Sequence, residues 1–481
     1  MAISAASAFP RLSWLLLCSL TCAVPALAQD GSDRSGDAPA ENRNGSLTPP
    51  TAAAPSTEVA PEAAPDAAAG QSAIMREVAK FAEFDELRPQ GQTSDFPGVY
   101  ETITQDAGGF RTWLYDNNLY FRGSTTNPIS YDVAGTPATK ATQSYVGQRF
   151  TATQANDLRL SWKFGGSGND ITQLNTGVII NSSTWARLGP SGVRFNNLNI
   201  FSSFFDRKVE IKAGVTGNVN EFVGIFSGGN PILAAGLAAS IPVSTGMSGG
   251  IAATPTFNVQ LNGKRGFYSK SGIQRSIVPE GTEVEVDGSG AGLKLTRRGA
   301  RPLFIQEFGV RRPASADSRQ IWLRAGASYN LSRYARLDGG GRDRNWMIYA
   351  LGDYQITQPD KRAAYRGVYV GASALFGDDA VNVYTRSLEA RVYAIGMIPG
   401  RPADQMTFTV GANRFSRSGG RALASAGQIT QRDQFSVGAL YALRATNGVF
   451  VSPSITYIRN PSFIGDLKPA VNLGAALVVL F

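Results

Sequence analysis

The segment that most constrains the fold is the C-terminal one, residues 471–481. Successive side chains of a β-strand point to opposite faces, so residues two apart share a face. Every second residue of this segment is apolar, and these residues are Val471, Leu473, Ala475, Leu477, Val479 and Phe481. The pattern predicts a strand that extends to the final residue and has one fully apolar face.

The same period of two recurs from about Phe96 onward, in segments separated by turns rich in Gly, Asn, Asp and Ser. Clear examples are residues 158–164, 209–214, 321–328, 388–394 and 406–413. Their apolar faces are rich in Ala and Val, which suits lipid because lipid needs no interlocking side chains. A soluble β-sandwich would instead interdigitate side chains between its two sheets. The pattern therefore favours a membrane barrel with an apolar outside and a polar inside.

After the first 28 residues, no segment is suited to cross a membrane as a helix. The longest apolar candidate, residues 231–243, is interrupted by Gly236, Ser240 and Pro242, whereas a spanning helix needs about 20 apolar residues. In a membrane, this leaves a closed β-barrel. The predicted fold class is all-β, a transmembrane antiparallel β-barrel over residues 95–481. At roughly 22–26 residues per strand with its connections, we expect about 16 strands, with 18 as the alternative.

The N-terminus has the features of an export signal. Arg11 precedes an apolar stretch that ends in Ala26-Leu27-Ala28, a small-x-small cleavage pattern. We interpret residues 1–28 as a signal peptide and the Pro- and Ala-rich residues 29–73 as a disordered linker. The expected destination is the bacterial outer membrane, reached through the periplasm.

A short amphipathic helix is predicted over residues 74–90. Its apolar residues recur at three- and four-residue spacing, and they are Ile74, Val78, Phe81, Phe84 and Leu87. Such a helix could enter the pore, contribute to oligomerisation, or lie against the periplasmic rim.

Residue types absent from the expected mature chain exclude much chemistry. Cys18 and Cys22 are the only cysteines, both lie within the signal peptide, and the chain has no histidine. Nucleophilic triads need an imidazole base, and zinc sites usually need His or Cys ligands. We therefore expect no enzyme activity, no metal and no cofactor. A glycosidase built on Glu307 and Glu389 is the one formal alternative, but these residues lie far apart in the sequence.

The net charge of +9 does not indicate nucleic-acid binding, because the basic residues are spread through strand-like segments. A basic pore lining, or contacts with lipid phosphates at the rims, explains the charge better. No nucleic-acid partner is expected.

Several motifs in the C-terminal half, from about Phe304 to Phe481, resemble the carbohydrate-selective porin (OprB) family. They are Phe-Ile-Gln-Glu-Phe-Gly at 304–309, Trp-Leu-Arg-Ala-Gly at 322–326, Gly-Met-Ile-Pro-Gly-Arg-Pro-Ala-Asp at 396–404, and residues 451–461. Residues 205–222 match more loosely, and most of residues 95–300 match weakly. The resemblance implies a 16-stranded barrel through which sugars, glucose among them, diffuse passively.

A sugar channel needs aromatic faces for pyranose rings and charged groups for hydroxyls, with weak binding so that the solute can leave. The alternation places candidate residues for both tasks on the inward face. These candidates are Glu307, Arg311, Trp322, Arg324, Tyr349, Tyr369, Glu389, Arg391 and Tyr393. Each could equally be generic lining that ties neighbouring strands together.

Two alternatives to a sugar channel remain at this stage. The surplus of basic residues would suit an anion-preferring or general porin for sugar acids or phosphates. A non-conducting structural or adhesive barrel is the other class. The expected partners are small sugars, outer-membrane lipids and the barrel assembly machinery, which reads a terminal aromatic residue such as Phe481. Whether the barrel acts alone or as an oligomer is left open.

Overall fold

The computed structural model describes residues 81–91, 98–185, 189–224, 240–361 and 363–481. The expected signal peptide (1–28), the linker (29–73) and the start of the expected helix (74–80) lie outside these ranges. None of the helices in the described ranges combines the length and apolarity that a membrane-crossing helix needs.

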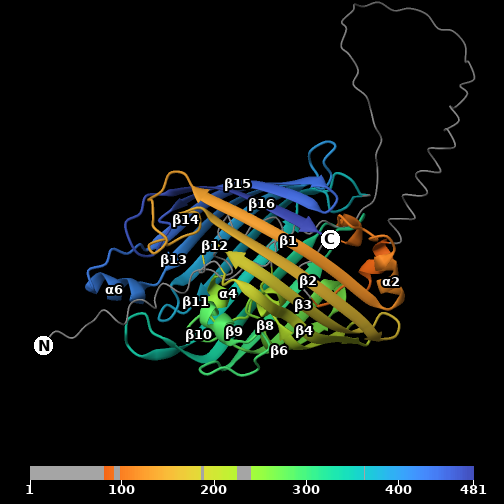
Figure 1. Cartoon of the computed structure of the whole chain (residues 1–481), viewed down its shortest axis with the longest axis horizontal. Helices are drawn as coiled ribbons and strands as arrows, with labels where there is room; N and C mark the ends of the chain where they lie inside the picture. The colour runs from red at the N-terminus through yellow and green to blue at the C-terminus, as the bar shows by residue number, and fades with distance from the viewer. Residues whose placement is uncertain (1–80, 92–97, 186–188, 225–239, 362) are drawn as a thin grey trace, which may run out of the picture.

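Sixteen antiparallel strands form one closed barrel in which each strand pairs with its neighbours in sequence and β1 pairs with β16 (Figure 1). The strands are β1 (Leu119–Asp132), β2 (Thr151–Gly165), β3 (Thr172–Ser183), β4 (Gly192–Phe204), β5 (Val209–Thr216), β6 (Thr254–Asn262), β7 (Phe267–Arg275), β8 (Pro302–Arg312), β9 (Ile321–Ala335), β10 (Arg342–Gln355), β11 (Gly367–Gly377), β12 (Tyr384–Ile395), β13 (Gln405–Phe415), β14 (Asp433–Thr446), β15 (Val449–Arg459) and β16 (Ala470–Leu480). The predicted fold class and the count of 16 strands are confirmed.

The two ends of the barrel differ in their connections. We call the end with Phe481 the proximal rim and the opposite end the distal rim; helix α2 (Phe110–Asp116) lies at the proximal rim and helix α6 (Arg417–Ser425) at the distal rim (Figure 1). The longest proximal connection covers residues 356–366, whereas distal ones cover residues 217–253 and 276–301. Short periplasmic turns and long outer loops are typical of outer-membrane barrels, and the proximal rim has the shorter connections of the two.

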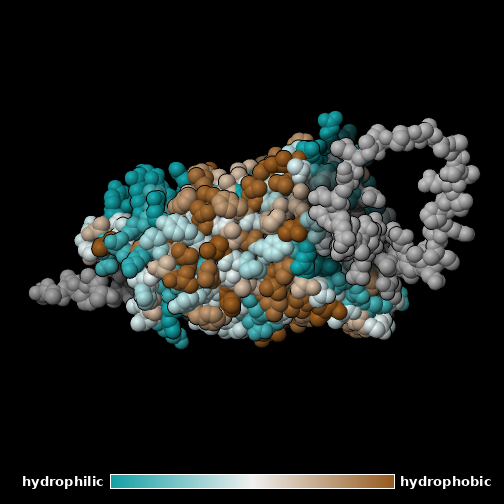
Figure 2. Space-filling view, turned by 90° about the horizontal axis from the view of Figure 1, so that it is seen from above, coloured by the Kyte–Doolittle hydropathy of each residue, from teal (hydrophilic) through white to brown (hydrophobic). Residues whose placement is uncertain are grey.

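The side chains alternate across the wall as the sequence predicts. On β9, Leu323 is 47% exposed on the outer face, whereas its neighbours Trp322 and Arg324 are each 4% exposed and point inward. Apolar residues form a band around the middle of the barrel, and polar residues collect toward both ends (Figure 2). This arrangement matches a lipid-facing surface between two aqueous rims.

The N-terminal part of the described chain packs at the proximal rim. Phe81, Phe84 and Leu87 form a buried cluster with Val99 and Tyr120. The helix predicted over residues 74–90 ends earlier, at position 85, and a turn follows. The reason is Pro89, which disfavours helical geometry in the residue before it.

The barrel wall also begins later than residue 95, the start predicted from the sequence. Before the first strand, the chain forms the short helix η3 (Val99–Glu101) and then α2. The wall therefore starts at Leu119, the first residue of β1.

The last residue closes the barrel. The backbone N–H of Gly123 donates to the carbonyl of Phe481 at 2.7 Å, and the N–H of Phe481 donates to the carbonyl of Gly123 at 2.9 Å. These two bonds extend the β1–β16 ladder, which pairs Ser124 with Leu480. The C-terminal strand thus continues to Phe481 in the structure as it does in the sequence pattern.

Candidate functional site

The connection between β5 and β6 folds into the barrel. We call its described parts, residues 217–224 and 240–253, the inner loop; it contains α3 (Asn218–Glu221) and α4 (Ser240–Ser244). Its backbone is tied to the inner wall through carbonyl groups. Asn330 Nδ2 donates to the carbonyl of Thr245 at 2.7 Å, and Asn345 Nδ2 donates to that of Ser244 at 3.0 Å.

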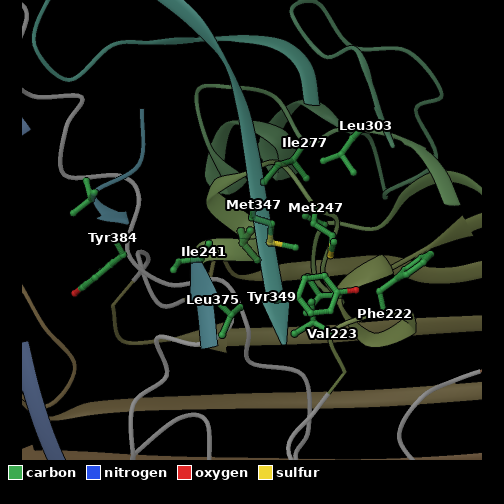
Figure 3. Close-up of a cluster of buried hydrophobic side chains, with 14 of the residues drawn as sticks. Phe222, Val223, Ile241, Met247, Ile277, Leu303, Met347, Tyr349, Leu375 and Tyr384 are labelled. Atoms are coloured by element: carbon green, nitrogen blue, oxygen red, sulfur yellow. The ribbon is translucent and has the colours of Figure 1, made fainter. Parts of the chain in front are cut away.

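Apolar side chains add to this attachment. Ile241 and Met247 of the inner loop pack against Met347 of β10 and Leu375 of β11 in one buried cluster (Figure 3). All four side chains have no exposed surface, and burial of each such side chain contributes about 1.5–3 kcal/mol. The inner loop is therefore fixed on the β8–β12 side and narrows the lumen there.

A buried carboxylate at the end of α3 joins the inner loop to two further strands. Glu221 Oε1 lies 2.7 Å from Lys212 Nζ of β5, and its Oε2 lies 3.3 Å from Lys270 Nζ of β7. Lys270 also donates to the carbonyl of Glu221 at 2.8 Å. Two cations around one anion leave this cluster with a net positive charge in the lumen.

Arg324 of β9 connects the inner loop to an aromatic group on the wall. Its Nε donates to the carbonyl of Val223 at 3.0 Å, and its guanidinium carbon lies 3.6 Å from the centre of the Trp322 ring. The guanidinium of Arg311 lies 5.0 Å from the same ring. Cations over the face of an indole are attracted by its quadrupole, so Trp322 and the two arginines form one unit.

Glu307 of β8 lies beside this unit and is fully buried. Its two carboxylate oxygens accept hydrogen bonds from the hydroxyl groups of Tyr268, at 2.8 Å, and Tyr349, at 2.7 Å. Both oxygens are therefore held by wall tyrosines, and the arrangement is that of a wall network rather than of a catalytic carboxylate pair.

A cavity of about 380 Å³ opens inside the barrel toward the proximal rim, and we call it the basic vestibule. Its lining is rich in cations, which are Arg88, Arg122, Arg159, Arg207, Lys270 and Arg311. Glu210 is the one acidic residue among the described lining residues, and Tyr120, Phe267, Tyr268 and Trp322 are the aromatic ones. The vestibule thus offers many hydrogen-bond donors beside aromatic rings.

The N-terminal segment contributes to the basic vestibule. The backbone N–H of Gln90 donates to Gln173 Oε1 at 2.7 Å, and Arg207 Nη2 donates to Gln90 Oε1 at 2.9 Å. Lys270 Nζ lies 3.4 Å from the carbonyl of Gly91. Residues 88–91 therefore lie within the lumen, next to the inner loop.

A second inward cluster lies on β10, β11 and β12. Arg391 donates to Asp353, to Ser373 Oγ at 2.8 Å and to Glu389 at 3.2 Å. Next to it, the rings of Tyr369 and Tyr393 stack at 4.8 Å within an apolar cluster that includes Phe450. These side chains contact one another rather than open space.

All nine candidate residues point inward, but they divide into three groups. Arg311 and Trp322 line the basic vestibule. Arg324 bonds to the inner loop, and Glu307 and Tyr349 bond to each other on the wall beside it. The remaining four belong to the second cluster, and they are Tyr369, Glu389, Arg391 and Tyr393.

Several residues of the site were not among the nine candidates. Arg159 and Lys212 occupy inward positions of the alternation, so the sequence contained a signal for them. Asp353 is likewise on the inward face, four residues from Tyr349. Glu221 lies in a loop, where no periodicity identifies it. Across the described part of the chain, no group of three or more potential metal ligands occurs.

A closed antiparallel barrel with an apolar outer band, a charged lumen and an inward-folded loop is the architecture of a porin, a channel protein of the outer membrane of Gram-negative bacteria. The profile described as "Carbohydrate-selective porin, OprB family" matches residues 129–481. The chain belongs to this family.

One solved structure agrees with this assignment at the level of the fold, and others align less well. OprB of Pseudomonas putida, in a structure at high pH, aligns with a TM-score of 0.65 at 16% identity, covering 81% of this chain and 100% of that one. A low-pH structure of the same protein gives 0.49 at 15% identity, covering 80% and 100%. A triple mutant of the Rhodopseudomonas blastica porin gives 0.43 at 11% identity, covering 76% and 100%. No curated protein sequence matches the chain.

Proposed function

We propose that the barrel is a channel for passive diffusion of small carbohydrates, glucose among them, and that solute contacts the wall in the basic vestibule. The observation that carries the proposal is the lining of this cavity, which combines guanidinium groups with aromatic side chains. A guanidinium presents several N–H donors in a fixed fork, which suits pairs of neighbouring sugar hydroxyls. Aromatic rings suit the apolar faces of a pyranose.

The three groups of candidate residues have different tasks in this proposal. Arg311 and Trp322 contact solute because they line open space. Arg324 holds the inner loop at a fixed distance from the wall, and Glu307 and Tyr349 brace the wall beside it. The cluster around Arg391 ties three strands together and stiffens the barrel.

Rates of solute entry into liposomes test the proposal. Neutral sugars should enter faster than zwitterions of the same size. Sugar hydroxyls accept hydrogen bonds from the arginines, whereas the cationic group of a zwitterion is repelled by them. Equal rates for the two solute classes would indicate a general porin without a preference for sugars. Absence of any entry would favour a structural or adhesive barrel.

An anion-preferring channel for sugar acids or phosphates is the second candidate, and the charge of the basic vestibule favours it. Six cations and one carboxylate line this cavity, and such a lining attracts anions. Reversal potentials in planar bilayers distinguish the two functions. Strong anion selectivity together with slow glucose entry would support the second candidate.

We also propose that residues 1–28 and Phe481 act in export and assembly of the barrel. Residues 1–28 would direct export and be removed, and the strand ending at Phe481 would be recognised by the assembly machinery. If so, a variant Phe481→Ser should accumulate less folded barrel in the outer membrane than the unaltered protein. Equal accumulation would argue against this role of the terminal residue.

A further inference from the structure

A group of basic residues lies on the outside of the barrel, at the distal rim. Tyr329 of β9 and Trp346 of β10 are outward-facing aromatic residues, 43% and 38% exposed. Such residues mark the membrane interface. Further toward the distal rim, β9 carries Arg333 and β10 begins with Arg342, both exposed. These arginines therefore lie at the depth of the lipid headgroups.

The connection between β7 and β8, residues 276–301, adds further cations to the same place. Together with the two strands, it lines a hollow of about 840 Å³, which we call the rim hollow. Its basic residues are Lys294, Arg297, Arg298, Arg301, Arg333 and Arg342. Glu280 is the one acidic residue among the lining residues.

Local contacts hold part of this lining in place. Arg297 donates to the carbonyl of Val284 at 2.8 Å and to that of Gly288, at the end of helix α5 (Thr282–Gly288). Arg342 Nη2 donates to the carbonyl of Arg333 at 2.8 Å and lies 3.6 Å from Glu280. The backbone N–H of Arg301 donates to Ser332 Oγ at 2.8 Å.

Most cations of the rim hollow have no acidic partner among the residues that the structure describes. Within the described ranges, Lys294, Arg298, Arg301 and Arg333 form no ion pair with a carboxylate. Like charges held close together repel one another, so a site of this kind gains stability from a bound anion. Arginine forks match phosphate oxygens in particular.

We propose that the rim hollow binds the phosphate groups of a phosphorylated glycolipid in the outer leaflet of the membrane. Its location favours a lipid over a free solute, because it opens on the outer face of the wall, away from the lumen. The surface beneath it can receive acyl chains. On the same two strands, Leu323, Ala325 and Ala350 line an apolar hollow of the outer face that extends from β6 to β13, and Ile348 is also exposed. Basic clusters at the membrane surface recognise anionic headgroups in this way.

Binding to the purified full-length protein in detergent tests the proposal, with native mass spectrometry as the readout. Three probes are compared: bisphosphorylated lipid A, the same lipid with both phosphates removed, and inorganic phosphate. We expect the bisphosphorylated lipid to bind, and the triple variant Arg298→Gln, Arg301→Gln, Arg333→Gln to weaken its binding by roughly tenfold or more. Arg386→Gln is a single-site control, because Arg386 is an exposed outward arginine at the distal rim of β12, over the ring of Phe376.

Three outcomes would overturn the proposal. Equal binding of the dephosphorylated lipid would show that the phosphates are not recognised. Displacement of the lipid by inorganic phosphate at equal concentration would indicate a site for free anions. An equal loss in the Arg386→Gln control would mean that any exposed arginine of the distal rim, and not this hollow in particular, determines binding. Sugar entry should be unchanged in the triple variant, so this test is independent of the proposed channel function.

Discussion

Arg391 and Asp353 form a bidentate ion pair across three strands of the barrel wall. Arg391 Nε lies 2.9 Å from Asp353 Oδ1, and Nη2 lies 2.7 Å from Oδ2. The two residues are 2% and 1% exposed. Because Arg391 belongs to β12 and Asp353 to β10, the pair spans β11, whose Ser373 accepts a third bond.

Removal of one partner of this pair should destabilise the barrel strongly. The variant Arg391→Met leaves the carboxylates of Asp353 and Glu389 buried near each other without the cation that bonds to both. We expect a loss of about 3–5 kcal/mol in the free energy of unfolding, measured by urea unfolding with gel mobility as the readout of the folded barrel. Arg459→Met is the control, since Arg459 is exposed at the end of β15. An equal loss in both variants would contradict a special role for the pair.

Charge selectivity should depend on Arg311. The variant Arg311→Gln removes a cation from the basic vestibule, so the reversal potential in a salt gradient should shift toward cation passage. Entry of neutral sugars should also slow by a factor of roughly 2–10, since one typical hydrogen bond contributes about 0.5–1.5 kcal/mol. Arg312→Gln is a close control, because Arg312 is the next residue of β8 and is exposed. If both variants behave alike, Arg311 does not contact solute.

Loosening the inner loop should alter conductance. The double variant Asn330→Ala, Asn345→Ala leaves the carbonyls of Thr245 and Ser244 without these donors, at a cost of about 1–3 kcal/mol for each. We expect larger and noisier single-channel currents, because the loop then fluctuates in the lumen. Asn413→Ala is the control, since Asn413 bonds to Gln434 on the wall. Quiet currents of unchanged size would show that the apolar cluster alone holds the loop.

Docking of the N-terminal segment should depend on pH through Asp85. Burial raises the pKa of Asp85 above its ordinary value, although Arg88 and the N–H of Val99 partly oppose this effect. A raised pKa means that the docked state favours the protonated carboxyl. Its contribution is therefore complete below the ordinary pKa and is lost as the pH rises through the raised value.

Hydrogen exchange of residues 81–91, corrected for the intrinsic effect of pH, measures this dependence. The segment should be better protected at about pH 4 than at about pH 7. The variant Asp85→Asn should flatten the difference, because an amide does not ionise. Greater protection at the higher pH would reverse the sign of the effect and exclude Asp85 as its cause.

The wall could be predicted from the sequence because one local rule repeats in every strand. Alternation alone places Leu323 in lipid and Trp322 inside the barrel, and the structure agrees. No such rule predicts the positions of the side chains in the inner loop. Glu221 is positioned by Lys212 and Lys270, which are 9 and 49 residues away in the sequence, and only the closed fold brings the three together.

Alternation predicts the face to which a side chain points, but it does not predict which other side chains surround it. Tyr393 and Trp322 both point inward, yet Tyr393 stacks on Tyr369 whereas Trp322 lines the vestibule. The difference depends on which side chains of neighbouring strands lie opposite, and therefore on the register of the whole barrel. For this reason the nine candidates could be placed on the inner face but could not be divided into lining and packing residues.

The contact between Gly123 and Phe481 should determine the stability of the seam that closes the barrel. A Cβ atom added at Gly123 would overlap the Phe481 ring, so the ring covers this glycine, as aromatic residues often do in sheets. The variant Gly123→Ala must displace the ring and should cost about 1–3 kcal/mol, seen as a lower Tm of the folded band on gels. Gly165→Ala is the control, since its new Cβ would meet only Thr172 at an ordinary 3.4 Å.

The combination of Gly123→Ala with Phe481→Ala should cost less than the sum of the two single changes, because the overlap is then gone. Strict additivity would show that the ring does not contact this position.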